Sequence, residues 1–293
     1  MENFDLLIIG GGAAGMAAAA AAAPRCSVLL VDSEPRLGGI LNQCVHQGFG
    51  DGCTGPEYAA ALIQQVEASG VSVQTSTFAL QLFPNRTALL SRRSGVFRVG
   101  FRRCLIAAGC YERTIGALPV SGTRPAGVFT AGTVQRLLCD GYPVGNRILV
   151  LGSGDVGQIV ARQLVQSGQQ VLAVVEQRDR LGGLARNRRD CIEAYHIPVL
   201  LRTTAEVLHG QGRLEGVTVR HLDTGARQVI ACDTLVTAVG LIPDRTLCQA
   251  VMENSALPGW LGLCGNCDYV HDMVERVTAE AKRLGGEFGR MEL

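Results

Sequence analysis

An excess of charge of either sign is absent from this sequence. Its 27 lysine and arginine residues are balanced by 26 aspartate and glutamate residues, which leaves a formal net charge of +1. Nucleic acids and anionic membrane surfaces attract proteins with a large basic excess. Neither is therefore expected as a partner of this chain.

A hydrophobic run of membrane-spanning length is also absent. The alanine-rich stretch Ala13–Ala23 is about one helix long, well short of the ~20 residues needed to cross a bilayer. A secretion signal is not expected either, because the acidic residues Glu2 and Asp5 precede the first apolar run, which glycines then interrupt. We expect a cytoplasmic protein without membrane insertion.

A disulfide framework is not indicated, although the chain has eleven cysteines. Their number is odd and they are scattered, so in a reducing cytosol most are expected to be small buried hydrophobes. What the chain has in quantity is apolar sequence, since 47% of its 293 residues are hydrophobic and 18% are charged. This composition predicts folded domains rather than disorder, and the length suits two of them.

Two glycine patterns carry most of the information. Gly10–Gly15 (GGGAAG) follows the apolar run Leu6–Ile9, and Gly152–Gly157 (GSGDVG) follows the apolar run Ile148–Leu151. Each fits G-x-G-x-x-G between a predicted strand and a predicted helix, where such a loop holds the pyrophosphate of a dinucleotide. The chain is therefore predicted to be an α/β protein with two Rossmann-like dinucleotide-binding domains.

In the first pattern each glycine has its own task. Gly10 permits the tight turn, Gly12 lets the backbone approach a pyrophosphate, and Gly15 lets the helix lie against the strand. The helix expected over Ala13–Ala23 directs its positive N-terminal end at the phosphates. The next strand leads to Asp32, twenty residues after Gly12, where a carboxylate can accept hydrogen bonds from a ribose. The alternative is a glycine-rich turn without a ligand.

The second pattern is also followed by a helix, a strand and an acidic residue. A strand expected over Gln170–Val175 leads to Glu176. A carboxylate at this place favours a free 2′-hydroxyl and repels a 2′-phosphate, which predicts NAD(H) rather than NADP(H). Arg178 and Arg180 follow closely and could weaken that preference. The alternative is a domain that binds nothing.

Asp155 is an unusual residue inside a phosphate loop. We expect its side chain to point to solvent or to cap the helix predicted over Val156–Ser167. The residues expected at the second nucleotide site are Gly152, Gly154, Asp155, Val156, Gly157 and Glu176.

The two halves also resemble each other beyond the glycines. Asp32–Gly39 (DSEPRLGG) matches Glu176–Gly183 (EQRDRLGG). With both fingerprints, the chain resembles the FAD-dependent pyridine nucleotide-disulfide oxidoreductases, in their short thioredoxin-reductase-like architecture, over essentially its whole length. In that family an NAD(P) domain interrupts the FAD domain. The resemblance implies that residues 1–109 and 241–293 form a discontinuous FAD domain and residues 110–240 the inserted NAD(H) domain.

The resemblance also implies the FAD contacts. Asn266 stands where the family has an aspartate that bonds the ribityl chain, and an amide can still donate and accept there. A helix expected over Val270–Leu284 would present its N-terminus to the flavin's N1–C2 carbonyl edge. The implied FAD-binding residues are Gly10, Gly12, Ala13, Ala14, Gly15, Asp32, Ser33, Gly39, Ile40, Gln47, Gly109, Gly265 and Asn266.

Three further segments narrow the resemblance. Gly39–Gly50, Gly183–Asn187 and Cys264–Asn266 with Val270–Asp272 resemble a subgroup without the redox disulfide. Its members are flavoprotein subunits that act beside glycerol-3-phosphate, amino-acid or opine dehydrogenases. This implies a small-molecule redox substrate or a partner dehydrogenase subunit, in a homodimer or a heteromeric complex.

Neither of the thiol pairs of the family's disulfide reductases is complete in this chain, because only one of the four positions, Cys139, is a cysteine. One arrangement would place them at Leu41 and His46, and the other at Arg136 and Cys139. No flavin-linked disulfide is therefore expected.

Cys264 and Cys267 form the chain's one C-x-x-C pair. A helix N-terminus could make such a pair redox-active, and with His271 it would still leave a structural zinc site short of four ligands. We expect the two cysteines to pack in the interior and expect no metal site.

Cys44 and His46 are the candidate catalytic residues. The resemblance implies that their segment runs past the isoalloxazine ring, where His46 could relay a proton and Cys44 could tune the ring. The alternative is that both simply line the flavin pocket.

These features predict an FAD-dependent oxidoreductase that transfers hydride between NAD(H) and a flavin, as an electron-transfer subunit or partner of a dehydrogenase system. A second hypothesis is a direct FAD-dependent dehydrogenase or oxidase of a small amine or hydroxy acid. A third, of another class, is a non-catalytic nucleotide-binding assembly subunit.

Overall fold

The chain leaves its first unit after Tyr111 and returns to it at Ile242. The computed structural model describes residues 1–290 except residues 253 and 255. Unit 1 consists of Met1–Tyr111 and Ile242–Leu293, and unit 2 of Glu112–Leu241. The boundaries expected from the sequence, at residues 109/110 and 240/241, lie within two residues of these. The two crossings, β9 (Cys110–Glu112) and β19 (Leu241–Pro243), pair with each other.

Unit 1 is built on a parallel sheet that continues into an antiparallel meander. β1 pairs in parallel with β2 and β8, so the carboxyl ends of these strands meet at one edge. Because both faces of β1 are covered, its run Leu6–Ile9 is apolar without alternation. The strands in spatial order are β5 (Ser72–Gln74), β2 (Val28–Val31), β1 (Glu2–Ile9), β8 (Gly95–Ile106), β7 (Thr87–Arg92) and β6 (Phe78–Phe83), with β20 (Leu261–Leu263) added on β8.

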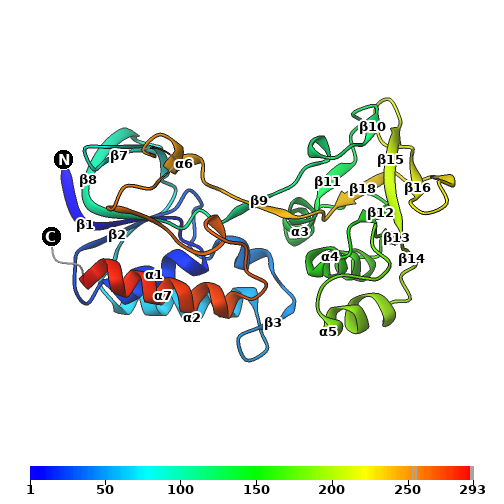
Figure 1. Ribbon diagram of the computed structural model, residues 1–293. Helices are drawn as coiled ribbons and strands as arrows, with labels where there is room; N and C mark the ends of the chain where they lie inside the picture. The colour runs from blue at the N-terminus through cyan, green and yellow to red at the C-terminus, as the bar shows by residue number, and fades with distance from the viewer. Residues whose placement is uncertain (253, 255, 291–293) are drawn as a thin grey trace. The chain divides into compact units, whose positions relative to one another are not determined.

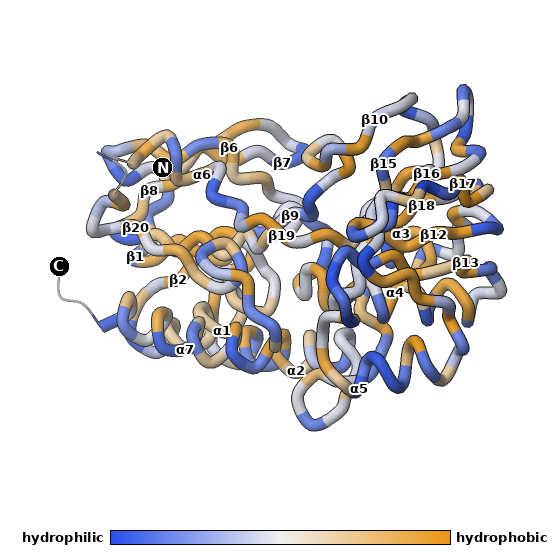
Figure 2. The backbone as a smooth tube through the Cα atoms, turned by 45° about the vertical axis from the view of Figure 1, so that its right-hand side comes forward, coloured by the Kyte–Doolittle hydropathy of each residue, from blue (hydrophilic) through white to orange (hydrophobic). Residues whose placement is uncertain are grey.

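Three helices cover one face of this sheet, α1 (Ala13–Ala22), α2 (Gly55–Ala68) and α7 (Val274–Arg290) (Figure 1). Along α7 the chain alternates between hydrophilic and hydrophobic colours in Figure 2, as expected for a helix with one buried face. On the opposite face, apolar side chains of β1 and β2 form a second core with those of the meander strands. A short 3-10 turn, η1 (Gly39–Gln43), and a small hairpin of β3 (Gln47–Phe49) and β4 (Cys53–Thr54) connect β2 to α2.

The last helix does not have the expected bounds. The sequence predicts a helix over Val270–Leu284, whereas α7 covers Val274–Arg290. It continues through Gly285 and Gly286, a pair of residues that usually disfavours a helix. Gly285 lies in the contact between α7 and α1, which the sequence pattern alone does not reveal.

Unit 2 is a second parallel sheet with an antiparallel sheet on one face. Its parallel strands in spatial order are β11 (Val128–Thr130), β18 (Thr234–Thr237), β12 (Arg147–Leu151), β13 (Gln170–Val175) and β14 (Val199–Leu200). Helices α3 (Ala131–Cys139) and α4 (Asp155–Gln166) pack on one face. The other face carries β10 (Ser121–Gly122), β15 (Thr203–His209), β16 (Gly216–His221) and β17 (Arg227–Ile230). The predicted fold class, two Rossmann-like units with one inserted into the other, is confirmed.

Candidate dinucleotide-binding sites

The first glycine fingerprint forms the turn from β1 into α1. Gly10 has φ +108°, and a side chain there would strike the carbonyl group of Ala107. A Cβ at Gly15 would overlap the carbonyl oxygen of Gly10. These two glycines are therefore required by the turn and by the close approach of helix to strand.

Gly12 differs from its two neighbours. Its φ is −76°, which any residue can adopt, and no described atom of the chain lies within 4 Å of the Cβ that it lacks. Neither backbone conformation nor internal packing accounts for a glycine here. A group from outside the chain that approaches the backbone closely, such as a pyrophosphate, would account for the glycine.

The second fingerprint repeats this geometry between β12 and α4. Gly152 has φ +102° and lies against the carbonyl of Ala238, and a Cβ at Gly157 would strike the carbonyl of Gly152. Gly154 has φ −62°, and the space around its missing Cβ contains no described atom within 4 Å. Gly154 is thus the counterpart of Gly12.

Both helices that follow begin without a side-chain cap. Gly12 is the N-cap of α1 and Gly154 the N-cap of α4, and among the described residues no side chain accepts a hydrogen bond from either first turn. The first N–H groups of a helix need an acceptor, and their partial positive charge favours an anion. Each loop therefore offers open space and free donors together, and the residues present fit the phosphates of a dinucleotide.

Each predicted ribose acid directly follows the second strand of its β–α–β motif, β1–α1–β2 or β12–α4–β13. Asp32 follows β2 and accepts hydrogen bonds from the N–H of Gly11 and, at 2.7 Å, of Glu34. Burial raises the pKa of Asp32, while these two N–H groups act in the opposite direction. The hydrogen bonds join the strand end to the glycine loop. The contact of each acid with a ribose stays a prediction.

Glu176 follows β13 in the same way. It accepts hydrogen bonds from the N–H of Ser153 at 3.1 Å, from the Ser153 hydroxyl at 2.5 Å and from the N–H of Arg178 at 2.9 Å. Ser153 is the second residue of its fingerprint, as Gly11 is of the first. Both acids are buried. In both halves the acid therefore accepts a hydrogen bond from the backbone N–H of the second fingerprint residue.

Parts of unit 1 that are distant in sequence meet at the start of α1. Gly265, with φ +67°, lies so close to Ala14 that a Cβ there would be 2.7 Å from the Ala14 side chain. Gly39, in the turn after Asp32, lies beside Gly12. The structure thus brings three of the sequence-predicted FAD segments together.

The side chain of Asn266 is oriented by its neighbours. Its Oδ1 accepts a hydrogen bond from the N–H of His271 at 3.0 Å, which leaves Nδ2 toward the sulfur of Cys110, 3.9 Å away. The aspartate of the family could not donate in this way. The contact of Asn266 with a ribityl chain stays a prediction.

Other candidates lie on the connection from β2 to α2. Ser33, Ile40 and Gln47 are exposed. His46 contacts the ring of Phe49, with ring centroids 5.1 Å apart, and the carbonyl of Cys44 accepts the N–H of Gly55. The catalytic roles of Cys44 and His46 remain predictions.

The expectation for Asp155 is wrong. Its carboxylate neither points freely to solvent nor caps α4, because Oδ1 accepts hydrogen bonds from the N–H of Leu184 at 2.7 Å and from Nδ2 of Asn187 at 2.6 Å. Sequence reasoning also missed Gln158, which is fully buried and binds two loop carbonyls. The available signal was its place in the repeat, where the first half has Met16.

The C-x-x-C pair is buried. Cys264 and Cys267 both have no exposed surface, and the thiol of Cys267 donates to the carbonyl of Ile106 at 2.9 Å. Burial raises the pKa of both thiols. The thiolates that disulfide chemistry requires are thus disfavoured. Among the described residues, no group of three or more His, Cys, Asp or Glu side chains is arranged to hold a metal ion.

We therefore expect Cys264 and Cys267 to resist alkylation by iodoacetamide in the native protein, while the exposed Cys139 reacts. Timed labelling followed by peptide mass spectrometry measures this, with the urea-unfolded protein as the control in which all three react. Modification of Cys264 or Cys267 at the rate of Cys139 would contradict the buried, protonated state.

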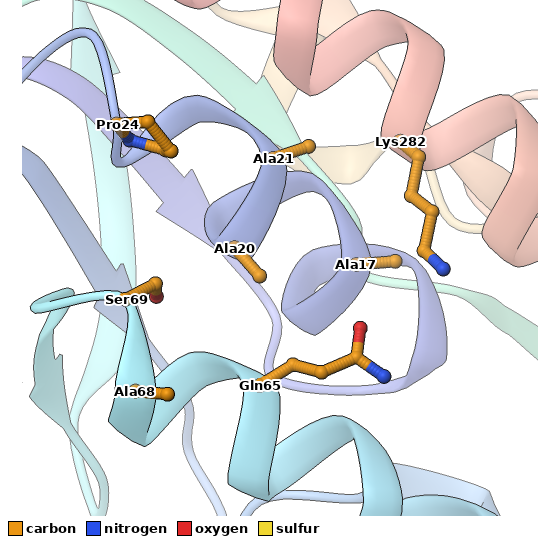
Figure 3. Close-up of a pocket in the computed structure, with 8 residues that line it drawn as sticks. All are labelled: Ala17, Ala20, Ala21, Pro24, Gln65, Ala68, Ser69 and Lys282. Carbon is orange, nitrogen blue, oxygen red and sulfur yellow. The ribbon is translucent and has the colours of Figure 1, made fainter.

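A surface depression in unit 1 lies elsewhere (Figure 3). Its volume is about 520 Å³, and it is open between α1, α2 and α7. It borders the later turns of α1, away from the N-terminal turn at Gly12, so it is not part of the nucleotide site. It is lined by Ala17, Ala20, Ala21, Pro24, Gln65, Ala68, Ser69 and Lys282.

Comparisons with known proteins agree with this geometry. The family model described as pyridine nucleotide-disulphide oxidoreductase matches residues 4–257. An opine oxidase subunit of Rhizobium meliloti is 30% identical over 183 residues, 60% of this chain and 39% of that protein. The thioredoxin reductase of Treponema pallidum is 24% identical over 68% of this chain and 66% of its own length. The chain thus spans less than two thirds of either relative.

A solved structure shows the same fold. The T. acidophilum thioredoxin reductase superposes with a TM-score of 0.74 at 19% identity, over 99% of this chain and 97% of that one. The resemblance to the pyridine nucleotide-disulphide oxidoreductases that the sequence predicts is confirmed by the family model. Among the described residues, no helix has the length and apolar composition to span a bilayer.

Proposed function

Because this chain belongs to the pyridine nucleotide-disulphide oxidoreductase family, we propose that it transfers hydride between NAD(H), held by unit 2, and FAD, held by unit 1. The observation that carries the proposal is the pair Gly12 and Gly154, two glycines that nothing inside the chain requires. When bound, FAD supplies the ring that takes up hydride from a nicotinamide. The chain itself binds the two pyrophosphates and holds the ribose acids in place.

Anaerobic titration with NADH tests this proposal. The FAD-loaded protein is expected to lose its visible absorbance on mixing in a stopped-flow spectrometer. A flavin that stays oxidised with both NADH and NADPH would overturn it. Reduction by a small amine or hydroxy acid alone would favour the direct dehydrogenase, and protein that binds no flavin would favour the assembly role.

The proposed route for the electrons continues to a second protein. At the positions where the family's reductases carry their thiol pairs, this chain has Cys139 but no partner for it, and its buried C-x-x-C pair is unsuited to replace them. One relative is itself named as part of a larger enzyme, the opine oxidase. Both observations support a role as an electron-transfer subunit or partner of a dehydrogenase, in a homodimer or a heteromeric complex.

The proposed preference for NAD(H) depends on Glu176. Glu176 is buried and directly follows β13, where we expect the adenosine ribose to bind. Glu176→Gln keeps the shape and removes the charge that would repel a 2′-phosphate. We expect this variant to raise the ratio of kcat/KM for NADPH over NADH by about tenfold, since one such charge contact contributes about 1–2 kcal/mol.

Rates of flavin reduction with each coenzyme measure that ratio. Asp179→Asn is the control, because Asp179 is an exposed acid of the same loop that pairs with Arg202 at 3.6 Å. A wild-type protein that reduces faster with NADPH, or an unchanged ratio in Glu176→Gln, would refute the assignment.

A further inference from the structure

The two halves differ in how the turn that follows the ribose acid is connected to the glycine loop. At the repeat offset of the fingerprints, the nonpolar residues Gly11, Ala13 and Met16 of the first half correspond to Ser153, Asp155 and Gln158 of the second. In the first half the turn after the ribose acid joins its loop through the backbone, as Gly38 N–H donates to the Gly11 carbonyl at 2.9 Å. In the second half side chains make the connection.

Ser153 and Gln158 hold the start of the turn. The hydroxyl of Ser153 accepts the N–H of Gly182 at 2.9 Å. Nε2 of Gln158 donates to the carbonyls of Ser153 and Gly182, both at 2.8 Å. One buried amide thus joins the fingerprint to the turn that follows Glu176.

Asp155 holds the end of the same turn through its bonds to Leu184 and Asn187. The segment Gly182–Asn187, called the strap below, is therefore anchored at both ends to α4 and its loop. Gly182 rests directly on the fingerprint, because a Cβ there would lie 3.4 Å from the Ser153 carbonyl and 3.7 Å from Cα of Gly154. The strap borders the open space over Gly154.

The burial of Gln158 is energetically unfavourable. Both its partners are carbonyl groups, so Nε2 must face them, and Oε1 is left buried without a partner among the described residues. An unsatisfied buried acceptor destabilises the folded protein. Met16 fills the corresponding position of the first half without this cost and is equally buried. Packing alone does not explain the glutamine, whereas its hold on the strap does.

We propose that Asp155 and Gln158 are positioning residues that fix the strap beside the pyrophosphate of the pyridine dinucleotide and thereby set its dissociation rate. The inference rests on the proposed function, in which unit 2 binds that dinucleotide. Hydrogen bonds from side chains can open while the backbone hydrogen bonds of the sheet and of α4 stay intact. This suits a coenzyme that exchanges in every catalytic cycle, while the backbone-held loop of unit 1 suits one that stays bound.

Two substitutions of Asp155 distinguish its role as an anchor from the effect of its charge. Asp155 is the first residue of α4, where a carboxylate would compete with the pyrophosphate for the helix N-terminus. Asp155→Asn keeps an oxygen that accepts from Leu184 and Asn187, whereas Asp155→Ala removes the anchor. If anchoring matters, the alanine variant loses the coenzyme faster and the asparagine variant does not.

The experiment uses the FAD-loaded protein with four variants: Gln158→Met, Asp155→Ala, Asp155→Asn and, as control, Gln166→Met. Gln166 lies at the far end of α4 and bonds the hydroxyl of Tyr195. Stopped-flow displacement measures NAD⁺ dissociation. A second readout without coenzyme is tryptic cleavage after Arg186, Arg188 and Arg189, which follow or lie within the strap's last anchored turn.

We expect Gln158→Met and Asp155→Ala to raise the dissociation rate about tenfold or more, as the loss of a hydrogen bond to a charged or buried partner predicts. Both should also be cut faster by trypsin. Asp155→Asn and Gln166→Met should stay within about threefold of wild type, a change below the contribution of one hydrogen bond.

Three results would overturn the inference. Unchanged dissociation and cleavage in Gln158→Met and Asp155→Ala would show that the strap is not anchored there. Faster cleavage with unchanged dissociation would make the anchors structural only. Equal acceleration in Asp155→Asn and Asp155→Ala would assign the effect to charge. Failure of the wild-type protein to bind either pyridine nucleotide would instead overturn the proposed function, and the cleavage assay separates this case.

Discussion

Replacing Gly154 with alanine is expected to leave a folded, yellow protein whose flavin is reduced by NADH about 100-fold less efficiently, the equivalent of about 3 kcal/mol of lost binding. The new methyl group meets no described atom of the chain, and φ of −62° suits alanine. It does occupy the space that the pyrophosphate needs. The measurement is kcat/KM for anaerobic flavin reduction, beside the visible absorbance that reports bound FAD.

The reciprocal variant supplies the control. Gly12→Ala should fold and melt as the wild-type apoprotein does, or gain about 0.4–1 kcal/mol from the stiffer unfolded chain, but should purify without flavin. Gly157→Ala, by contrast, forces a Cβ against the carbonyl of Gly152 and should unfold unit 2. If Gly154→Ala is reduced like the wild type, the open space over that residue is not the coenzyme site.

Much of this site was predictable from the sequence because its causes are local. The turn after the first strand of each motif requires a positive φ, which accounts for Gly10 and Gly152. The length of one strand–helix–strand motif accounts for the positions of Asp32 and Glu176. The bounds of β13 were predicted to the residue. Such features depend on contacts within about 30 residues of chain, where spacing and periodicity are informative.

The features that sequence reasoning missed depend on partners that spacing does not specify. Asp155 was misread because its hydrogen-bond partners, Leu184 and Asn187, lie on a loop beyond the next strand. Gln158 was missed because a polar residue on a helix is usually exposed, and its burial follows from the loops above it.

Two adjacent glycines of α7 allow the contact of this helix with α1 to be tested. Gly285 faces α1, where a Cβ would overlap the backbone of Ala18 and lie 2.7 Å from its Cα. Gly286, next to it, has no described atom within 4 Å of its Cβ position. Both sit inside a helix, so alanine gains about 1 kcal/mol of helix propensity at either position. The difference between the two variants therefore reports the steric contact.

We expect Gly286→Ala to melt at or above the wild-type temperature and Gly285→Ala to melt below it, with a difference in unfolding free energy of about 2–3 kcal/mol, typical of overpacking in a core. Because α7 belongs to the C-terminal segment and α1 begins at the first fingerprint, Gly285→Ala should also release FAD at a lower temperature. Thermal denaturation followed by circular dichroism and by flavin fluorescence measures both. Equal melting of the two variants would mean that α7 does not press on α1 at this residue. The glycine at position 285 would then lack its explanation in close packing.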